Sequence, residues 1–231
     1  MKRLAVAAAA LLLVYLIAAY GIAPLVWEDY EARLPLDGRE MVTRTPSGIP
    51  GDPVNIGFVA SRAELLRAFA ESAWNPADPV TLASAVEIGL SVALDRPYKD
   101  APISALVFDG RTQDLALEKQ DGPSADRRRH VRLWRISGAS AEGRDFWLGS
   151  ASYDRGVGIS HTTGEVTHHI APDVDAERDY VAANIAKNAS VEATVTIPGV
   201  GPTWEGRNGG GDLYFTDGNA VVVFLAPAAT P

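Results

Sequence analysis

The chain has 231 residues, 47% of them hydrophobic, which is enough to bury one substantial core. Its formal net charge of -8 argues against a nucleic-acid partner, because nucleic-acid binding requires a basic surface. The chain contains no cysteine, so disulfides and thiolate metal sites are both excluded.

Residues 1–27 predict a transmembrane anchor. Lys2 and Arg3 precede an uncharged run over residues 4–27, and two acidic residues follow it. As a helix, these 24 residues would extend about 36 Å, enough to cross a hydrocarbon core of roughly 30 Å. The charge asymmetry predicts a cytoplasmic N-terminus and an exported remainder. The alternative is a cleaved signal peptide, although the apolar region of such peptides is usually only about 7–15 residues long.

The exported part is expected to form one domain. Residues 28–52 are rich in proline and glycine and predict a linker that is not helical. Residues 53–225 contain no repeat and no internal boundary, which indicates a single globular domain. Residues 226–231 predict a disordered tail.

The domain is expected to begin with a strand and two helices. Residues 54–60 have the apolar and β-branched composition of a strand. Ser61 follows as the N-cap of a helix, and Glu64, three residues later, completes a capping box. Residues 81–94 predict a second helix, because large apolar side chains recur there every four residues.

The second half of the domain is expected to be rich in short strands, at residues 103–108, 115–118, 130–136, 146–153, 191–197, 213–215 and 220–225. Residues 216–219, between the last two strands, predict a hairpin turn. A third helix is expected over residues 174–187, with Asp173 as its N-cap. This order predicts an α+β fold: a mostly antiparallel sheet with about three packed helices, preceded by one N-terminal transmembrane helix.

Three of the four histidines lie in an acid-rich segment, residues 154–179. Histidine has an unperturbed pKa near neutral pH, so this segment is the first candidate for a functional site. Thr163 and Gly164 predict a tight hairpin turn that places residue 161 opposite residue 166. In that register His161 and His168 share one face of the hairpin, whereas His169 points to the other.

Two interpretations of this segment remain open. In the first, His161, His168 and Asp173 bind a divalent metal, and His169 or Asp154 acts as a general base. In the second, the segment is a junction between a hairpin and a helix, held by capping and charge-assisted hydrogen bonds. The second is favoured, because the histidines do not have the spacing of a known metal-binding motif.

A second candidate is the basic segment RRRHVRLWR at residues 127–135. As a strand, it places His130 and Arg132 on one face. Arginine can bind a phosphate or carboxylate through two parallel hydrogen bonds, so this face is a candidate anion site. The alternative is a structural ion-pair network. Arg127 and Arg128 are expected to be solvated residues of the preceding loop.

Six short motifs follow one another along the chain: TPSGIPGDPVN, RPYKDAP, GRTQDLALEK, RRRHVRLW, SYDRGVG and VTHHIAPDVDAERD. In these motifs the chain resembles the C-terminal domain of LssY-type bacterial envelope proteins. The resemblance implies a domain often fused to multi-span membrane modules that resemble lipid phosphatases or DedA-type proteins, and it implies no catalytic residues. This chain has one expected anchor and lacks phosphatase-type arginine and histidine motifs, so no lipid-phosphate chemistry is carried over.

We therefore expect a non-enzymatic accessory or binding domain, held to the bacterial inner membrane through residues 4–27 and facing the periplasm. Its ligand would be an anionic, phosphate- or lipid-linked molecule or an envelope protein partner, bound by His130, Arg132, Arg155 and Arg178. The first alternative is a metal-assisted hydrolase of a phosphorylated envelope substrate, with a divalent metal as its cofactor. The second is a purely structural partner of a multi-span membrane protein.

Overall fold

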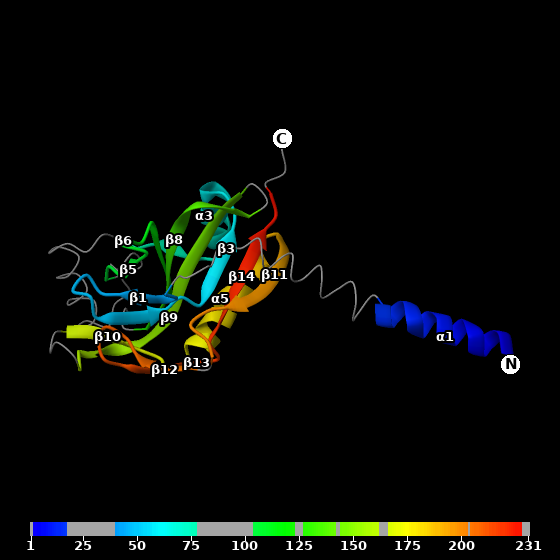
Figure 1. The fold of residues 1–231 in the computed structure, drawn as a ribbon. Helices are drawn as coiled ribbons and strands as arrows, with labels where there is room; N and C mark the ends of the chain where they lie inside the picture. Colours follow the sequence, from blue (N-terminus) through cyan, green and yellow to red (C-terminus); the bar gives the residue numbers. More distant parts are fainter. Residues whose placement is uncertain are drawn as a thin grey trace. The chain divides into compact units, whose positions relative to one another are not determined.

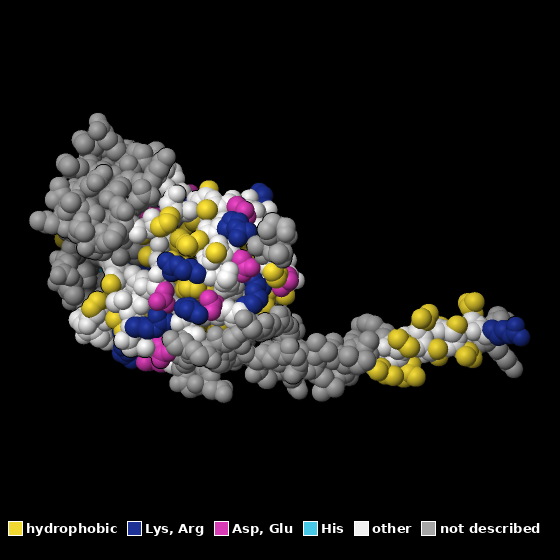
Figure 2. All heavy atoms as spheres, turned by 90° about the horizontal axis from the view of Figure 1, so that it is seen from above, with side chains coloured by type: hydrophobic (Ala, Val, Ile, Leu, Met, Phe, Trp, Pro, Cys, Tyr) yellow, Lys and Arg dark blue, Asp and Glu magenta, His cyan; other side chains and the backbone are white. Residues whose placement is uncertain are grey.

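The computed structural model describes residues 2–17, 40–77, 104–122, 127–141, 144–161, 166–202 and 204–227. The chain divides into two compact units, residues 1–37 and 38–231. In the first unit, α1 (Lys2–Ile17) is a helix of 16 residues with exposed apolar side chains, among them Leu4 and Leu11 (Figure 2). Among the described residues, the structure contains no helix long and apolar enough to cross a membrane.

The second unit is built on an eight-stranded sheet, in which the long strands β8 (Arg128–Ala141) and β9 (Arg144–Ile159) lie side by side (Figure 1). The strand order is β11 (Val191–Pro198), β14 (Asn219–Leu225), β3 (Ile56–Val59), β9, β8, β7 (Leu115–Gln120) and β4 (Asn75–Pro76), with β10 (Val166–Ile170) paired to the end of β9. β14 and β3 are parallel, whereas the other pairs are antiparallel.

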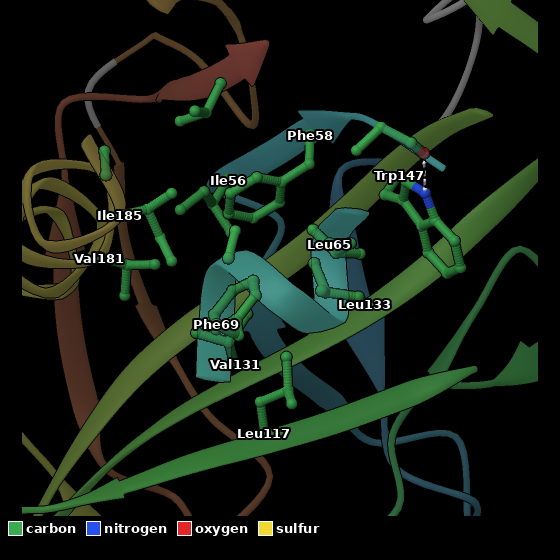
Figure 3. Close-up of a cluster of buried hydrophobic side chains, with 14 of the residues drawn as sticks. Ile56, Phe58, Leu65, Phe69, Leu117, Val131, Leu133, Trp147, Val181 and Ile185 are labelled. Atoms are coloured by element: carbon green, nitrogen blue, oxygen red, sulfur yellow. Dashed lines mark hydrogen bonds between the residues drawn. The ribbon is translucent and has the colours of Figure 1, made fainter. Parts of the chain in front are cut away.

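Two helices, α3 (Arg62–Glu71) and α5 (Val174–Asn188), cover one face of this sheet. Their apolar sides meet sheet residues in a single core, which Figure 3 shows with Leu65 and Phe69 of α3, Val181 and Ile185 of α5, and Val131 and Leu133 of β8. The caps are as predicted, because Ser61 and Glu64 form a capping box and Asp173 accepts a hydrogen bond from the backbone N–H of Ala176. Local sequence therefore determines where both helices begin.

The described residues of this unit also form two smaller sheets. The first contains β2 (Pro50–Pro53), β1 (Val42–Arg44), β5 (Val107–Phe108) and β6 (Arg111–Thr112), and the second pairs β12 (Trp204–Arg207) with β13 (Leu213–Thr216). The first lies on the side of β8 away from the core, because Arg132 contacts Asp52 and Trp134 donates a hydrogen bond to the carbonyl of Arg111.

The α+β class and the mostly antiparallel sheet are confirmed. The helix expected at residues 81–94 lies outside the described residues. Part of the expected linker differs from prediction, since residues 42–44 and 50–53 form β1 and β2 within the second unit. Met41 and Val42 are buried there, and the Thr43 hydroxyl donates to the carbonyl of Asp52, so burial and pairing order a segment rich in proline and glycine.

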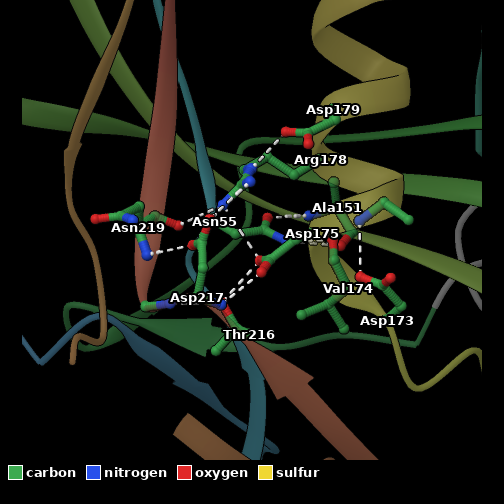
Figure 4. Close-up of polar contacts among 12 residues, drawn as sticks. Asn55, Ala151, Asp173, Val174, Asp175, Arg178, Asp179, Thr216, Asp217 and Asn219 are labelled. Atoms are coloured by element: carbon green, nitrogen blue, oxygen red, sulfur yellow. Dashed lines mark hydrogen bonds and ion pairs between the residues drawn. The ribbon is translucent and has the colours of Figure 1, made fainter. Parts of the chain in front are cut away.

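The prediction of a hairpin around residues 216–219 is wrong. β13 pairs with β12, whereas β14 pairs with β11 and β3. The turn is instead attached to α5, because the Asp175 carboxylate accepts hydrogen bonds from the Thr216 hydroxyl and the backbone N–H of Asp217, and Arg178 forms an ion pair with Asp217 (Figure 4). These contacts with the helix direct the chain from one sheet to another.

Candidate ligand-binding site

A cavity of about 400 Å³ lies on the face of the large sheet opposite the helices. Its floor is formed by side chains of β8, β9 and β10. Its walls are the β1–β2 turn at residues 45–49, residues 104–106, and the loop at residues 208–210. Asp52 of β2 also reaches this cavity. The site therefore joins segments that are far apart in the sequence.

The polar floor follows from the alternation of side chains along β8. Val131 and Leu133 point into the core, so Arg128, His130 and Arg132 point to the opposite face. All three of these polar side chains are buried. The expectation that Arg128 is a solvated loop residue is wrong, because β8 already begins at Arg128 and pairs there with β9.

Buried carboxylates hold the two arginines of the floor. Arg132 Nη1 lies 3.3 Å from Asp52 Oδ2, and its Nε donates to the carbonyl of Ser104 at 3.1 Å. Arg128 Nη1 donates to Glu118 Oε2 at 3.2 Å. Each guanidinium group is already fixed by a partner, so ligand binding does not have to order these side chains.

Asp154 lies at the centre of the floor, directly opposite Arg128 on the neighbouring strand. Its Oδ2 atom is 3.4 Å from His130 Nε2, 3.8 Å from Arg128 Nε and 3.8 Å from His168 Nδ1. Among the described residues, Asp154 Oδ2, His130 Nε2 and Arg128 Nε are buried without a hydrogen-bond partner. Buried polar atoms are rarely left unpaired, so three of them around one cavity indicate a place for a bound polar molecule.

Burial also changes the charges on this floor. It raises the pKa of Asp154 to about 7, although Arg128 and Arg132 oppose the shift. It lowers the pKa of His130 well below 6.5, and the same two arginines lower it further. Near neutral pH the floor therefore carries two guanidinium cations, which the carboxyl groups of Asp52 and Glu118 hold. It also carries a neutral imidazole and, at Asp154, a carboxyl group that readily gains or loses a proton.

Other predicted ligand-binding residues lie elsewhere. The Arg178 side chain is buried in ion pairs with Asp175, Asp179 and Asp217, which join α5 to the turn before β14 (Figure 4). This network explains the position of Arg178 without a ligand. Arg155 is exposed on β9 and does not line the cavity.

The structure does not bring the predicted metal ligands together. His168 points to the cavity floor, where its ring lies 3.2 Å from Arg128 Nη2, and Asp173 caps α5. His161 lies 65% exposed, beyond the end of β9. The physical reason is the register, because Val166 pairs with Ile159 and not with His161, so the strands separate before His161 is reached.

His161 instead lies beside His169, with ring centroids 5.2 Å apart. His169 Nδ1 is 2.6 Å from Asp212 Oδ1, and His161 Nε2 is 3.9 Å from the same oxygen. One nitrogen of each imidazole and one carboxylate oxygen lie within 4.8 Å of one another, close enough to hold a metal ion. His169 is thus separated from Asp154, the other predicted general base, which faces the cavity.

Sequence reasoning missed three residues of these sites. Arg128 could have been recognised, because it lies two residues before His130 and therefore points to the same face of a strand as His130 and Arg132. Nothing in the sequence marks Asp52 or Asp212 as a site residue. Asp52 follows a proline- and glycine-rich stretch, and Asp212 follows three glycines. Only the three-dimensional fold places these two carboxylates next to the basic strand and the histidines.

The second unit is thus an α+β domain with a buried, charged cavity on the sheet face opposite α3 and α5. The model of the LssY C-terminus family matches residues 33–220, so the chain belongs to this family, as the sequence motifs indicated. A search of curated proteins and a search of solved structures each found no match.

Proposed function

We propose that this protein is a binding domain for a small anionic molecule, such as a phosphorylated or lipid-linked compound, and that it acts at the membrane without catalysing a reaction. The observation that carries the proposal is the cavity floor, where Arg128, His130 and Arg132 of one strand are buried. There Arg128 Nε, His130 Nε2 and Asp154 Oδ2 have no hydrogen-bond partner. The residues that carry these atoms line a space large enough for a phosphate group and part of the molecule that carries it.

The charges of the floor favour an anion when Asp154 is protonated. A ligand oxygen could then accept hydrogen bonds from Arg128 Nε and from the carboxyl group of Asp154. The neutral ring of His130 supplies a further donor or acceptor. Without the ligand, these groups stay buried and incompletely paired, which costs free energy. An anion that enters the cavity would remove this cost.

A tethered position at the membrane is part of the proposal. The uncharged run at residues 4–27 is long enough to span a bilayer, and α1 exposes apolar side chains over the first part of it. Lys2 and Arg3 before the run orient the cavity toward the periplasm of a bacterial inner membrane. Either a multi-span membrane protein or a lipid-linked molecule would then be within reach as a partner.

Titration calorimetry with inorganic phosphate tests the binding function on the full chain in detergent. We expect Arg132→Ala to weaken binding by about 10-fold or more, because a hydrogen bond to a charged group contributes about 1.5–3 kcal/mol. Arg135→Ala is the matched control, since Arg135 lies on the same strand with its side chain 59% exposed and paired to Asp145. His130→Gln provides a second variant that preserves most of the side-chain volume.

Equal phosphate affinity in wild type, Arg132→Ala and His130→Gln would contradict the proposal. So would the lack of any binding at millimolar phosphate. Circular dichroism of each variant establishes that a loss of binding does not reflect a loss of fold.

A hydrolase remains the second candidate, and one observation favours it. A carboxyl group with a pKa of about 7 inside a cavity is suited to general acid–base catalysis near neutral pH. In this candidate function Asp154 is the general acid or base that transfers the proton. Wild type would then cleave an aryl phosphate, and Asp154→Asn would reduce the rate by about 100-fold or more. A wild-type rate equal to that of Asp154→Asn would eliminate this candidate.

A further inference from the structure

We propose that His161, His169 and Asp212 form a binding site for a divalent transition metal, with Zn²⁺ as the preferred ion. The site lies where the chain just after β9 and the second half of β10 meet the loop at residues 208–212. It is distinct from the anion cavity, because none of these three residues lines that cavity. His168 lines the cavity, whereas the His169 ring contacts Asp212.

The side chains of this site already converge. His169 Nδ1 and Asp212 Oδ1 are 2.6 Å apart, and His161 Nε2 is 3.9 Å from the same oxygen. Tetrahedral Zn²⁺ with ligand distances of about 2.0–2.2 Å requires separations of roughly 3.3–3.5 Å between ligand atoms. Small side-chain rotations are therefore sufficient to place an ion among the three groups. The ion would take the place of the hydrogen bond between His169 Nδ1 and Asp212 Oδ1.

Asp212 is held in position by its own loop. The side chain is buried, and its Oδ2 atom accepts a hydrogen bond from the backbone N–H of Ile170 at 3.1 Å. Asn208 closes the loop through two hydrogen bonds to Asp212. Its side-chain Oδ1 accepts from the backbone N–H of Asp212, and its backbone N–H donates to the carbonyl of Asp212. These bonds leave Oδ1 directed at the histidines, as expected for a ligand oriented by its surroundings.

The two histidines are positioned by their backbones. The backbone N–H of His161 donates to the carbonyl of Gly210 at 2.8 Å, which holds this residue against the loop that carries Asp212. The ring of His169 lies over Gly158 of β9, where an added Cβ would be only 2.3 Å from Nε2. Glycine at this position thus provides the space that the imidazole occupies.

The donor set selects the type of ion. Two imidazole nitrogens and one carboxylate oxygen suit Zn²⁺ and its transition-metal neighbours, whereas Mg²⁺ and Ca²⁺ prefer oxygen ligands alone. Three protein ligands leave a fourth tetrahedral position for water or an exogenous anion. Since His161 is largely exposed, that position is accessible from solvent.

Calorimetric titration of the full chain with Zn²⁺ in detergent tests this site, with elemental analysis to give the stoichiometry. We expect one ion per chain. His161→Ala and Asp212→Asn should each weaken binding by about 100-fold or more, because residues that only orient a ligand already contribute about 10–100-fold. Asp173→Asn is the control, since Asp173 lies outside the site and asparagine is an equally good helix cap.

His161→Ala keeps the test interpretable, because an exposed side chain can be removed without a loss of core packing. Equal Zn²⁺ affinity in wild type and His161→Ala would overturn the proposal, as would a stoichiometry near zero for wild type. Loss of Zn²⁺ in Asp173→Asn but not in Asp212→Asn would also overturn it, in favour of the ligand set predicted from the sequence. None of these results depends on phosphate binding in the cavity.

Discussion

At the scale of single residues, Asp154 determines how the cavity responds to pH. It is buried between Arg128, His130 and His168, and it faces the Arg132–Asp52 pair across the floor. With a pKa of about 7, it changes from a neutral hydrogen-bond donor to an anion across the neutral range. An anionic ligand and an ionised Asp154 repel each other, so the two compete for the same guanidinium groups.

We predict that sulfate binds more weakly as the pH rises from 6 to 8. Sulfate keeps a constant charge over this range, so a change in its affinity reflects a change in the protonation of the protein. The sign follows from the raised pKa, because Asp154 is mostly neutral below about pH 7 and mostly ionised above it. Calorimetry at several pH values measures the effect. Asp154→Asn should bind sulfate with little pH dependence, and a wild-type affinity that rises with pH would contradict the prediction.

Asn55 shows how one buried polar residue joins three elements. It follows β2, and its Nδ2 donates to the carbonyls of Ala151 in β9 and Val174 in α5 (Figure 4). Its Oδ1 accepts from the backbone N–H of Ala151 at 2.9 Å. Asn55→Ala would leave these buried backbone groups unpaired.

We therefore predict that Asn55→Ala lowers the free energy of unfolding by about 2–4 kcal/mol. Urea denaturation followed by circular dichroism measures the change. Asn188→Ala serves as the control, because Asn188 is exposed at the end of α5 and its removal should change stability by less than about 0.5 kcal/mol. If both variants unfold at the same urea concentration, the role assigned to Asn55 is wrong.

At the scale of elements, the β9–β10 pair separates the two candidate sites. Its register directs His168 into the cavity and His169 toward Asp212. The glycines of β9 in this region have different surroundings, because an added Cβ at Gly158 would collide with the His169 ring, whereas one at Gly156 would meet no atom within 4 Å. This contrast provides a matched pair of substitutions.

We predict that Gly158→Ala weakens Zn²⁺ binding by about 10-fold or more, because the methyl group displaces the His169 imidazole. Gly156→Ala should leave Zn²⁺ affinity unchanged. Both variants should bind phosphate as wild type does, since neither glycine lines the cavity. Calorimetric titration measures the affinity of each variant for Zn²⁺ and for phosphate. Equal Zn²⁺ affinities for the two variants would contradict the assigned position of His169.

The elements that could be predicted from the sequence are those set by neighbours along the chain. Both helix starts depend on hydrogen bonds that span three residues, so Ser61 and Asp173 were recognisable as caps. The two faces of β8 were recognisable from alternation. The path after Thr216 was not, because it depends on contacts of Asp175 and Arg178 some forty residues away.

At the scale of the whole molecule, the net charge of -8 contrasts with the arginines buried at the cavity floor. The face of the second unit visible in Figure 2 carries Lys and Arg interspersed with Asp and Glu. An anion that approaches this described face is therefore not attracted over a long distance by a single basic surface. Its selection depends on the local arrangement inside the cavity.

Membrane attachment is predicted to depend on the apolar run at residues 4–27. Replacement of both Leu12 and Leu13 by aspartate places two charges near its middle, and each costs about 2.5–3.5 kcal/mol in a bilayer. We expect the wild-type chain to stay in the membrane fraction after alkaline extraction and the double variant to be released. Retention of both proteins in the pellet, or release of both, would contradict the proposed anchor.

The most direct test of the binding function is a crystal structure of the protein grown with tungstate, whose anomalous scattering locates the anion. We predict a tungstate peak in the cavity, with its oxygens within hydrogen-bond distance of Arg128 and His130 at the floor. A cavity that contains only water at high tungstate concentration, with the anion elsewhere on the surface, would contradict the account.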